Sequence, residues 1–120
     1  MLSFRVEGLP PSYNSSMKIN YNFREVSLSL EARVFKQRVK MCMPYADFTT
    51  ANTYKVEIEY HGNFKYKNGK NRRLDLQNMD KLLIDAIFDK LGADDSYLWQ
   101  LQECKIQDDN DYTVVNIHPL

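Results

Sequence analysis

The chain has 120 residues, which is room for one hydrophobic core, so we expect a single domain over residues 1–120. Hydrophobic residues make up 43% of the sequence, including six Phe, eight Tyr and one Trp, and this content argues against intrinsic disorder. Sixteen Lys and Arg balance sixteen Asp and Glu, so bulk charge gives no sign of a nucleic-acid partner. No apolar run is long enough to cross a membrane and nothing resembles a signal peptide, so a cytoplasmic location is expected.

The first elements along the chain are a strand, a loop and a segment with two interpretations. Apolar and polar residues alternate over Leu2–Leu9, the pattern of a strand with one buried face. Prolines and small polar residues from Pro10 to Ser16 predict a surface loop. The Tyr- and Asn-rich segment from Met17 to Ser27 fits either a hairpin or an extended excursion.

Helical spacing of apolar residues over Leu28–Met43 predicts an amphipathic helix with Ser29 as its N-cap. The apolar side, expected to face the core, consists of Leu30, Val34, Phe35, Val39 and Met41. The opposite side is basic and is interpreted as a solvated face, with DNA contact as the alternative. It consists of Arg33, Lys36, Arg38 and Lys40.

Strict alternation over Thr53–Tyr60 predicts a second strand. The segment Lys65–Arg73, called the basic loop from here on, follows it and contains an Asn-Gly turn. Its five cations are Lys65, Lys67, Lys70, Arg72 and Arg73. Composition alone favours a solvated loop, because lysine-rich turns are common on protein surfaces.

A second helix is predicted over Leu76–Leu91, with Gly92 at its end as the C′ residue. One side of it is apolar and is expected to face the core, namely Leu76, Met79, Leu83, Ile87 and Leu91. Two further strands, Trp99–Ile106 and Tyr112–Ile117, are predicted to form a hairpin around an acidic turn. The element order favours an α+β fold with a small mixed β-sheet and two amphipathic helices packed on one face.

Cys42 and Cys104 lack the spacing of metal ligands, and a reducing compartment disfavours a disulfide between them. Both are therefore interpreted as buried thiols that contribute to packing. Trp99 begins an apolar strand and is expected in the core rather than on a base-stacking surface.

Acidic residues flank the second helix at both ends. Asp75 stands at its entrance and Asp94–Asp95 follows its exit, about 24 Å away at 1.5 Å per helical residue. The two ends can meet only if the chain folds back or a second subunit supplies one of them. Together the carboxylates would suit Mg²⁺, and Lys81 could stabilise negative charge on a phosphate. The simpler interpretations are an N-cap for Asp75, a turn for Asp94–Asp95 and a solvated position for Lys81.

The segment Arg72–Ile87, followed by Gly92–Ser96, resembles the signature of RusA-type Holliday junction resolvases. The shared features are a basic lead-in, an Asp-x-Asp-Asn type of motif, a following lysine and a late Asp-Asp pair. The family's Pro-Pro-Ser-x-Asn loop is similar to Pro10–Asn14, and Lys105 stands where the family places a lysine. The resemblance covers most of the chain in the family's order.

The resemblance implies a homodimeric, Mg²⁺-dependent endodeoxyribonuclease, with Mn²⁺ as a substitute metal, that resolves four-way DNA junctions in recombination and repair. It implies that Asp75, Lys81 and Asp95 are catalytic. The implied metal ligands are Asp75, Gln77, Asp94 and Asp95. The implied DNA contacts are Lys65, Lys67, Lys70, Arg72, Arg73 and Lys105.

The sequence departs from the family at Gln77, which stands where the second motif aspartate is expected. An amide carbonyl can bind a metal but brings no negative charge, so weaker metal binding follows. One alternative is therefore a branched-DNA-binding relative with little or no cleavage. Two others are a DNA- or RNA-binding module without catalysis and an interaction domain whose acidic residues are only caps and turns.

Overall fold

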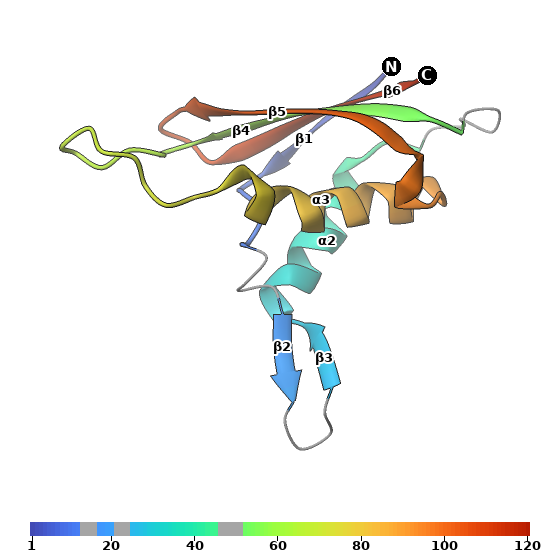
Figure 1. The fold of residues 1–120 in the computed structure, drawn as a ribbon, viewed down its shortest axis with the longest axis horizontal. Coiled ribbons are helices and arrows are strands. Elements are labelled where there is room, and N and C mark those ends of the chain that lie inside the picture. Colours follow the sequence, from blue (N-terminus) through green and yellow to red (C-terminus); the bar gives the residue numbers. More distant parts are fainter. Residues whose placement is uncertain (13–16, 21–24, 46–51) are drawn as a thin grey trace.

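In the computed structural model, which describes residues 1–12, 17–20, 25–45 and 52–120, one sheet carries both helices on a single face (Figure 1). The strand order in this sheet is β1-β6-β4-β5. The strands are β1 (Leu2–Glu7), β4 (Tyr54–Gly62), β5 (Leu98–Gln107) and β6 (Tyr112–Pro119). β4 pairs with β6 antiparallel and with β5 parallel. The α+β class with a mixed sheet, predicted from the sequence, is confirmed.

Both helices begin and end close to the predicted residues. α2 (Leu30–Cys42) has Ser29 as its N-cap, whose hydroxyl accepts a hydrogen bond from the amide of Ala32 at 3.2 Å. α3 (Leu76–Leu91) ends at Gly92, whose φ of 70° is the left-handed conformation that a C-terminal glycine adopts readily. Neither helix is long and apolar enough to span a membrane, and the same holds for every helix among the described residues.

A second, two-stranded antiparallel sheet projects from the helix side of the molecule (Figure 1). It consists of β2 (Met17–Asn20) and β3 (Glu25–Leu28), so the hairpin interpretation of this segment is confirmed. Pro10 and Pro11 are buried, which corrects the expectation of a surface loop at its start. The rest of that predicted loop, residues 13–16, lies outside the described residues.

The predicted hairpin of the last two strands is wrong, because β4 lies between β5 and β6. β6 pairs with one edge of β4, and β5, the strand that follows α3, pairs with the other edge. The turn after β5 then crosses the end of β4, where the amide of Asp108 donates to the carbonyl of Gly62 at 2.9 Å. A side chain at Gly62 would meet Asp111 Oδ1 at 2.9 Å and Leu9 Cδ1 at 3.0 Å. A glycine at this position therefore leaves room for the crossing.

α2 is rotated relative to the predicted orientation. Its buried residues are Ala32, Phe35 and Val39, whereas Leu30 is 68% exposed and Met41 is 77% exposed. Val34 is also exposed. Two ion pairs accompany this orientation of α2. Lys36 and Lys40, which belong to the predicted solvated face, lie 3.0 and 3.4 Å from a carboxylate oxygen of Asp89 on α3. α2 thus contacts α3 through part of its basic side.

The residues of β5 are far more exposed than predicted. Trp99 is 71% exposed rather than part of the core. Cys104 on β5 is an exposed thiol, and Cys42 at the end of α2 is exposed too, so the expectation of buried thiols is wrong. The reason on β5 is its position, since it pairs with β4 on one side and forms the edge of the sheet on the other.

Candidate active site

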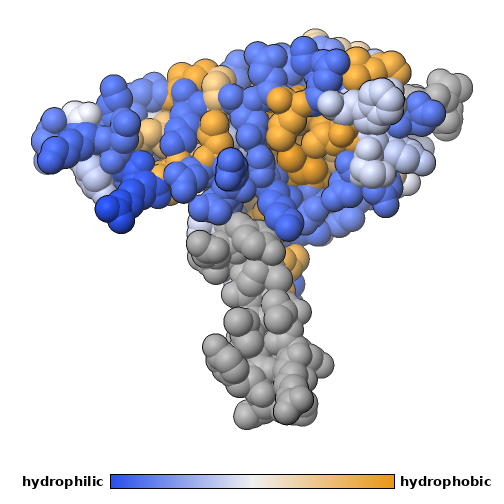
Figure 2. Space-filling model, viewed as in Figure 1, coloured by the Kyte–Doolittle hydropathy of each residue, from blue (hydrophilic) through white to orange (hydrophobic). Residues whose placement is uncertain are grey.

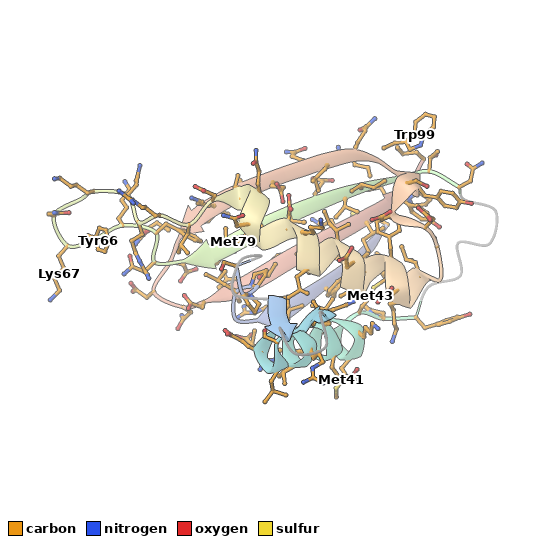
Figure 3. All side chains as sticks on the ribbon, turned by 60° about the horizontal axis from the view of Figure 1, so that its bottom comes forward. Met41, Met43, Tyr66, Lys67, Met79 and Trp99 are labelled. Atoms are coloured by element: carbon orange, nitrogen blue, oxygen red, sulfur yellow. The ribbon has the colours of Figure 1, made fainter. Side chains whose placement is uncertain are left out.

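The basic loop projects beyond the end of the sheet as a short ordered arm (Figure 1). The amide of Tyr66 donates to the carbonyl of Lys70 at 2.8 Å, and Lys65 bridges Asn71. Gly69 has a φ of 83°, as the Asn-Gly turn requires. All five predicted cations of this loop are exposed. Figure 3 shows Tyr66 and Lys67 extending from it into solvent, at the opposite end of the molecule from Trp99.

The base of the basic loop is fixed to the sheet. Arg72 donates through its backbone amide to the carbonyl of Phe64 at 2.9 Å, and through Nη1 to the carbonyl of Asn63 at 2.8 Å. The amide of Phe64 in turn donates to Oε1 of Gln107 on β5 at 2.9 Å. Lys105 is exposed nearby, with its Nζ 5.5 Å from the centre of the Phe64 ring. Its charge therefore lies at the root of the basic loop, beside the other predicted DNA contacts.

The basic loop leads directly to Asp75, which occupies the N-cap position of α3. The backbone of Asp75 is extended, as an N-cap requires, but its carboxylate makes no capping hydrogen bond. The side chains of Asp75 and Gln77 are both exposed. A charged oxygen and an amide oxygen are thus presented to solvent at the end of a row of cations.

At the opposite end of α3 is a second group of carboxylates, which we call the acidic cleft. It has a volume of about 390 Å³ and is lined by Lys36, Asp85, Phe88, Asp89, Ala93, Asp94 and Asp95. Burial raises the pKa of Asp85, Lys36 opposes this, and the charge of Asp95 raises it again. The hydrogen bond from Lys36 lowers the pKa of Asp89. Asp94 Oδ1 accepts from the amide of Ser96 at 2.8 Å, and this hydrogen bond lowers the pKa of Asp94.

The structure therefore separates the residues that the resemblance groups together. Asp75 and Gln77 lie at the start of α3, and Asp94 and Asp95 follow its end, with 16 helical residues between them. Lys81 lies between the two groups and is exposed. Among the described residues, no three His, Cys, Asp or Glu side chains come together as a metal site. One copy of the chain thus does not assemble the predicted set of ligands.

A third group of polar residues joins α3 to β5, and the sequence did not predict it. Glu103 of β5 shares a hydrogen bond with Asp80 of α3 and accepts another from the hydroxyl of Tyr60 at 3.2 Å. Burial, the contact with Asp80 and the charge of Asp80 raise the pKa of Glu103 to about 7. Burial also raises the pKa of Asp80. Only the alternation of β5, which places Glu103 on the same face as Leu101, could have indicated that Glu103 faces the helix.

Comparison with known proteins adds no family assignment. None of the protein-family models matches the chain, and no curated protein matches it significantly. The likeness to RusA-type resolvases accordingly rests on the motifs of the chain itself.

Proposed function

We propose that this protein is a structure-selective endodeoxyribonuclease of the RusA type, which resolves four-way DNA junctions in recombination or repair. The observation that carries the proposal is the junction of the basic loop with α3. Five cations without an intervening acid lead to a carboxylate that stands at a helix start and does not cap it. Cationic arms bind the phosphate backbone, and carboxylates bind the cations that assist phosphodiester hydrolysis.

The basic loop supplies the DNA contact. Positive charge is concentrated in this loop, because five of the 16 basic residues lie there and the rest of the chain carries 11 basic against 16 acidic residues. Phosphates are therefore attracted to this end of the molecule and repelled from the acidic cleft. Tyr66, at 57% exposure, is available for stacking on an unpaired base at a junction.

Lys81 is the residue proposed to stabilise charge on the reacting phosphate. It lies on the solvent side of α3, between Gln77 and Asp85, and an ammonium at this place can neutralise charge on the leaving oxygen. Carboxylates and an amide are suitable ligands for Mg²⁺ or Mn²⁺. A single chain does not fit such a metal, however, because its ligands lie at two ends of α3.

A branched-DNA-binding protein without cleavage is the second candidate. Gln77 favours it, because an amide in place of a carboxylate lowers the charge available to a divalent cation. For either function a cytoplasmic location is proposed, since two exposed free thiols are stable in a reducing compartment.

Cleavage of a labelled four-way junction, compared with linear duplex in Mg²⁺, Mn²⁺ or chelator, tests the proposal. The wild type is expected to introduce symmetric, metal-dependent nicks in the junction only. Asp75→Asn is expected to slow cleavage at least about 100-fold, because even outer groups around a metal contribute 10–100-fold. Asparagine is also a good N-cap, so the helix is preserved. Asp109→Asn, in the exposed turn, is the matched control.

Binding in chelator separates recognition from cleavage. The double variant Lys67→Ala/Lys70→Ala is expected to bind the junction more weakly and to reduce the salt slope of log affinity by about 2. Tight junction binding without cleavage in either metal would establish the second candidate function. Equal affinity for junction and duplex would contradict both.

A further inference from the structure

His61, at the end of β4, has a carboxylate against each nitrogen of its ring. Its Nε2 lies 3.0 Å from Oε2 of Glu59, and its Nδ1 lies 3.3 Å from Oδ2 of Asp108. Glu59 belongs to β4, whereas Asp108 begins the turn that follows β5. The side chain of His61 is only 12% exposed, so solvent has little access to either contact. His61 therefore connects β4 to the turn through the two nitrogens of one ring.

Both contacts are hydrogen bonds only if His61 is protonated. A carboxylate accepts hydrogen bonds but donates none, and a neutral imidazole has a single N–H to donate. In the neutral form, the other ring nitrogen would direct a lone pair at a carboxylate oxygen. The longer contact, to Asp108, is then the one that is released. Histidine is the side chain whose charge ordinarily changes between about pH 5 and 8, so the connection to the turn depends on pH in this range.

An aromatic stack fixes the plane of the His61 ring. Tyr112 of β6 stacks on it, with the ring centroids 4.1 Å apart and 11° between the planes. The guanidinium of Arg5 on β1 lies 3.7 Å from the centre of the same Tyr112 ring, and Glu7 balances its charge at 2.8 Å. The stack thus holds the imidazole in the orientation in which its nitrogens meet the two carboxylates.

The remaining groups around His61 leave it as the one whose charge changes near neutral pH. A backbone hydrogen bond within the turn lowers the pKa of Asp108, and the hydroxyl of Tyr112 and the ring of His61 lower it further. Cys104 of β5 stands beside Glu59 in the sheet. Partial burial and the charge of Glu59 raise the pKa of this thiol, so it stays uncharged.

The same turn supports the root of the basic loop. Gln107, the last residue of β5, accepts through Oε1 from the amide of Phe64 and donates through Nε2 to Oδ1 of Asn63, both at 2.9 Å. The amide of Asp108 donates to a carbonyl at the end of β4. Figure 1 shows the turn and the start of the loop at the same end of the sheet, and Figure 2 shows hydrophilic residues over that end. A displaced turn would lose hydrogen bonds that position the loop.

We infer that His61 is a positioning residue for the proposed DNA contact: its protonated ring holds the turn after β5, and with it the root of the basic loop, so that DNA binding weakens as the pH rises. The inference rests on the proposed function, because the basic loop is the proposed DNA contact. A loop that must be ordered on binding pays an entropic cost that an ordered loop avoids, and we expect release of the turn to weaken junction binding about fivefold.

Hydrogen exchange tests the structural part of the inference without DNA. The amides of Phe64 and Asp108 are followed by NMR at pH 6 and pH 8, with correction for the intrinsic pH dependence of exchange. Their protection is expected to fall with rising pH in the wild type and to be low at both pH values in His61→Gln, which cannot carry the second proton. His118→Gln is the matched control, because His118 pairs with Glu57 at the other end of β6 from the turn, and it should behave as the wild type does.

Asp108→Asn provides a second variant with a distinct expectation. The amide oxygen of asparagine can keep the hydrogen bond that Asp108 Oδ1 accepts from the amide of Asn110 at 3.1 Å. Its NH₂ group can donate to Nδ1 of a neutral His61, while Nε2–H still donates to Glu59. The neutral ring then makes both contacts, so junction binding by Asp108→Asn should no longer weaken as the pH rises. A purely electrostatic effect would instead strengthen binding at every pH and keep the wild-type pH dependence.

Junction affinity in chelator at fixed salt, measured at pH 6 and pH 8, completes the test. His61→Gln is expected to bind at both pH values as weakly as the wild type does at pH 8, whereas His118→Gln should follow the wild type. A pH-dependent loss of amide protection in a wild type that binds no DNA would support the role of His61 in the loop, and the proposed function alone would fail. Equal protection or equal affinity of the wild type at the two pH values, or a wild-type pH dependence in His61→Gln or Asp108→Asn, would overturn the inference and leave the nuclease proposal to the cleavage assay.

Discussion

Ser29 and Asp75 occupy the same position at the starts of the two helices, but only Ser29 uses its side chain as a cap. The hydroxyl of Ser29 accepts from an amide of the first turn of α2. Asp75 makes no such hydrogen bond, although aspartate is among the best capping residues. The exposed carboxylate of Asp75 therefore makes no capping contact, and this observation supports the metal-binding role proposed for it.

Paired alanine substitutions measure this difference. Ser29→Ala is expected to lower the free energy of unfolding by about 1 kcal/mol, the usual cost of losing an N-cap. Asp75→Ala is expected to cost less than about 0.5 kcal/mol, because only its interaction with the helix dipole is lost. Urea unfolding of both variants provides the comparison. An Asp75→Ala cost as large as that of Ser29→Ala would make Asp75 a structural cap.

The elements with strong local signals were predictable from the sequence. α3 has the predicted bounds because its apolar spacing and Gly92 act locally, and the alternation in β4 indicated a buried strand. The position of β5 was not predictable, because a short acidic turn between two strands favours a hairpin whether or not a third strand lies between them. The exposure of Trp99 and Cys104 and the role of Glu103 follow from that position.

The hydrogen bond between α3 and β5 makes stability depend on pH. The pKa of Glu103 in the folded protein is about 7 instead of 4.5, so folding favours its neutral form. This contribution is fully present below pH 4.5 and is lost as the pH rises towards and through 7. Because Glu103 is only half-buried, we expect a loss on the order of 1 kcal/mol between pH 5 and pH 8.

Glu103→Gln removes the titrating group but keeps a neutral hydrogen-bonding side chain. Urea unfolding at pH 5 and pH 8 is expected to show a smaller pH dependence in this variant than in the wild type and in Asp109→Asn. An unchanged pH dependence in Glu103→Gln would mean that Glu103 is already ionised in the folded protein at pH 5.

At the scale of the whole molecule, the distribution of charge supports the proposed function. The net charge of zero conceals a basic loop at one end and an acidic cleft at the other, with α3 between them. Phosphate groups would be attracted to the basic loop and repelled from the acidic cleft, so this distribution of charge favours the end of the molecule at which the DNA contact is proposed.

The most direct test of the account is the Mg²⁺ dependence of junction cleavage by the wild type and by Gln77→Asp. If the start of α3 holds the metal ligands, the added carboxylate strengthens metal binding, and Gln77→Asp should reach its half-maximal rate at a Mg²⁺ concentration roughly tenfold lower. Gln37→Glu, at an exposed position on α2, is the matched control and should leave the Mg²⁺ dependence unchanged. Junction nicking by neither protein, or an identical Mg²⁺ dependence in both, would contradict the assignment of this site as a metal-dependent nuclease centre.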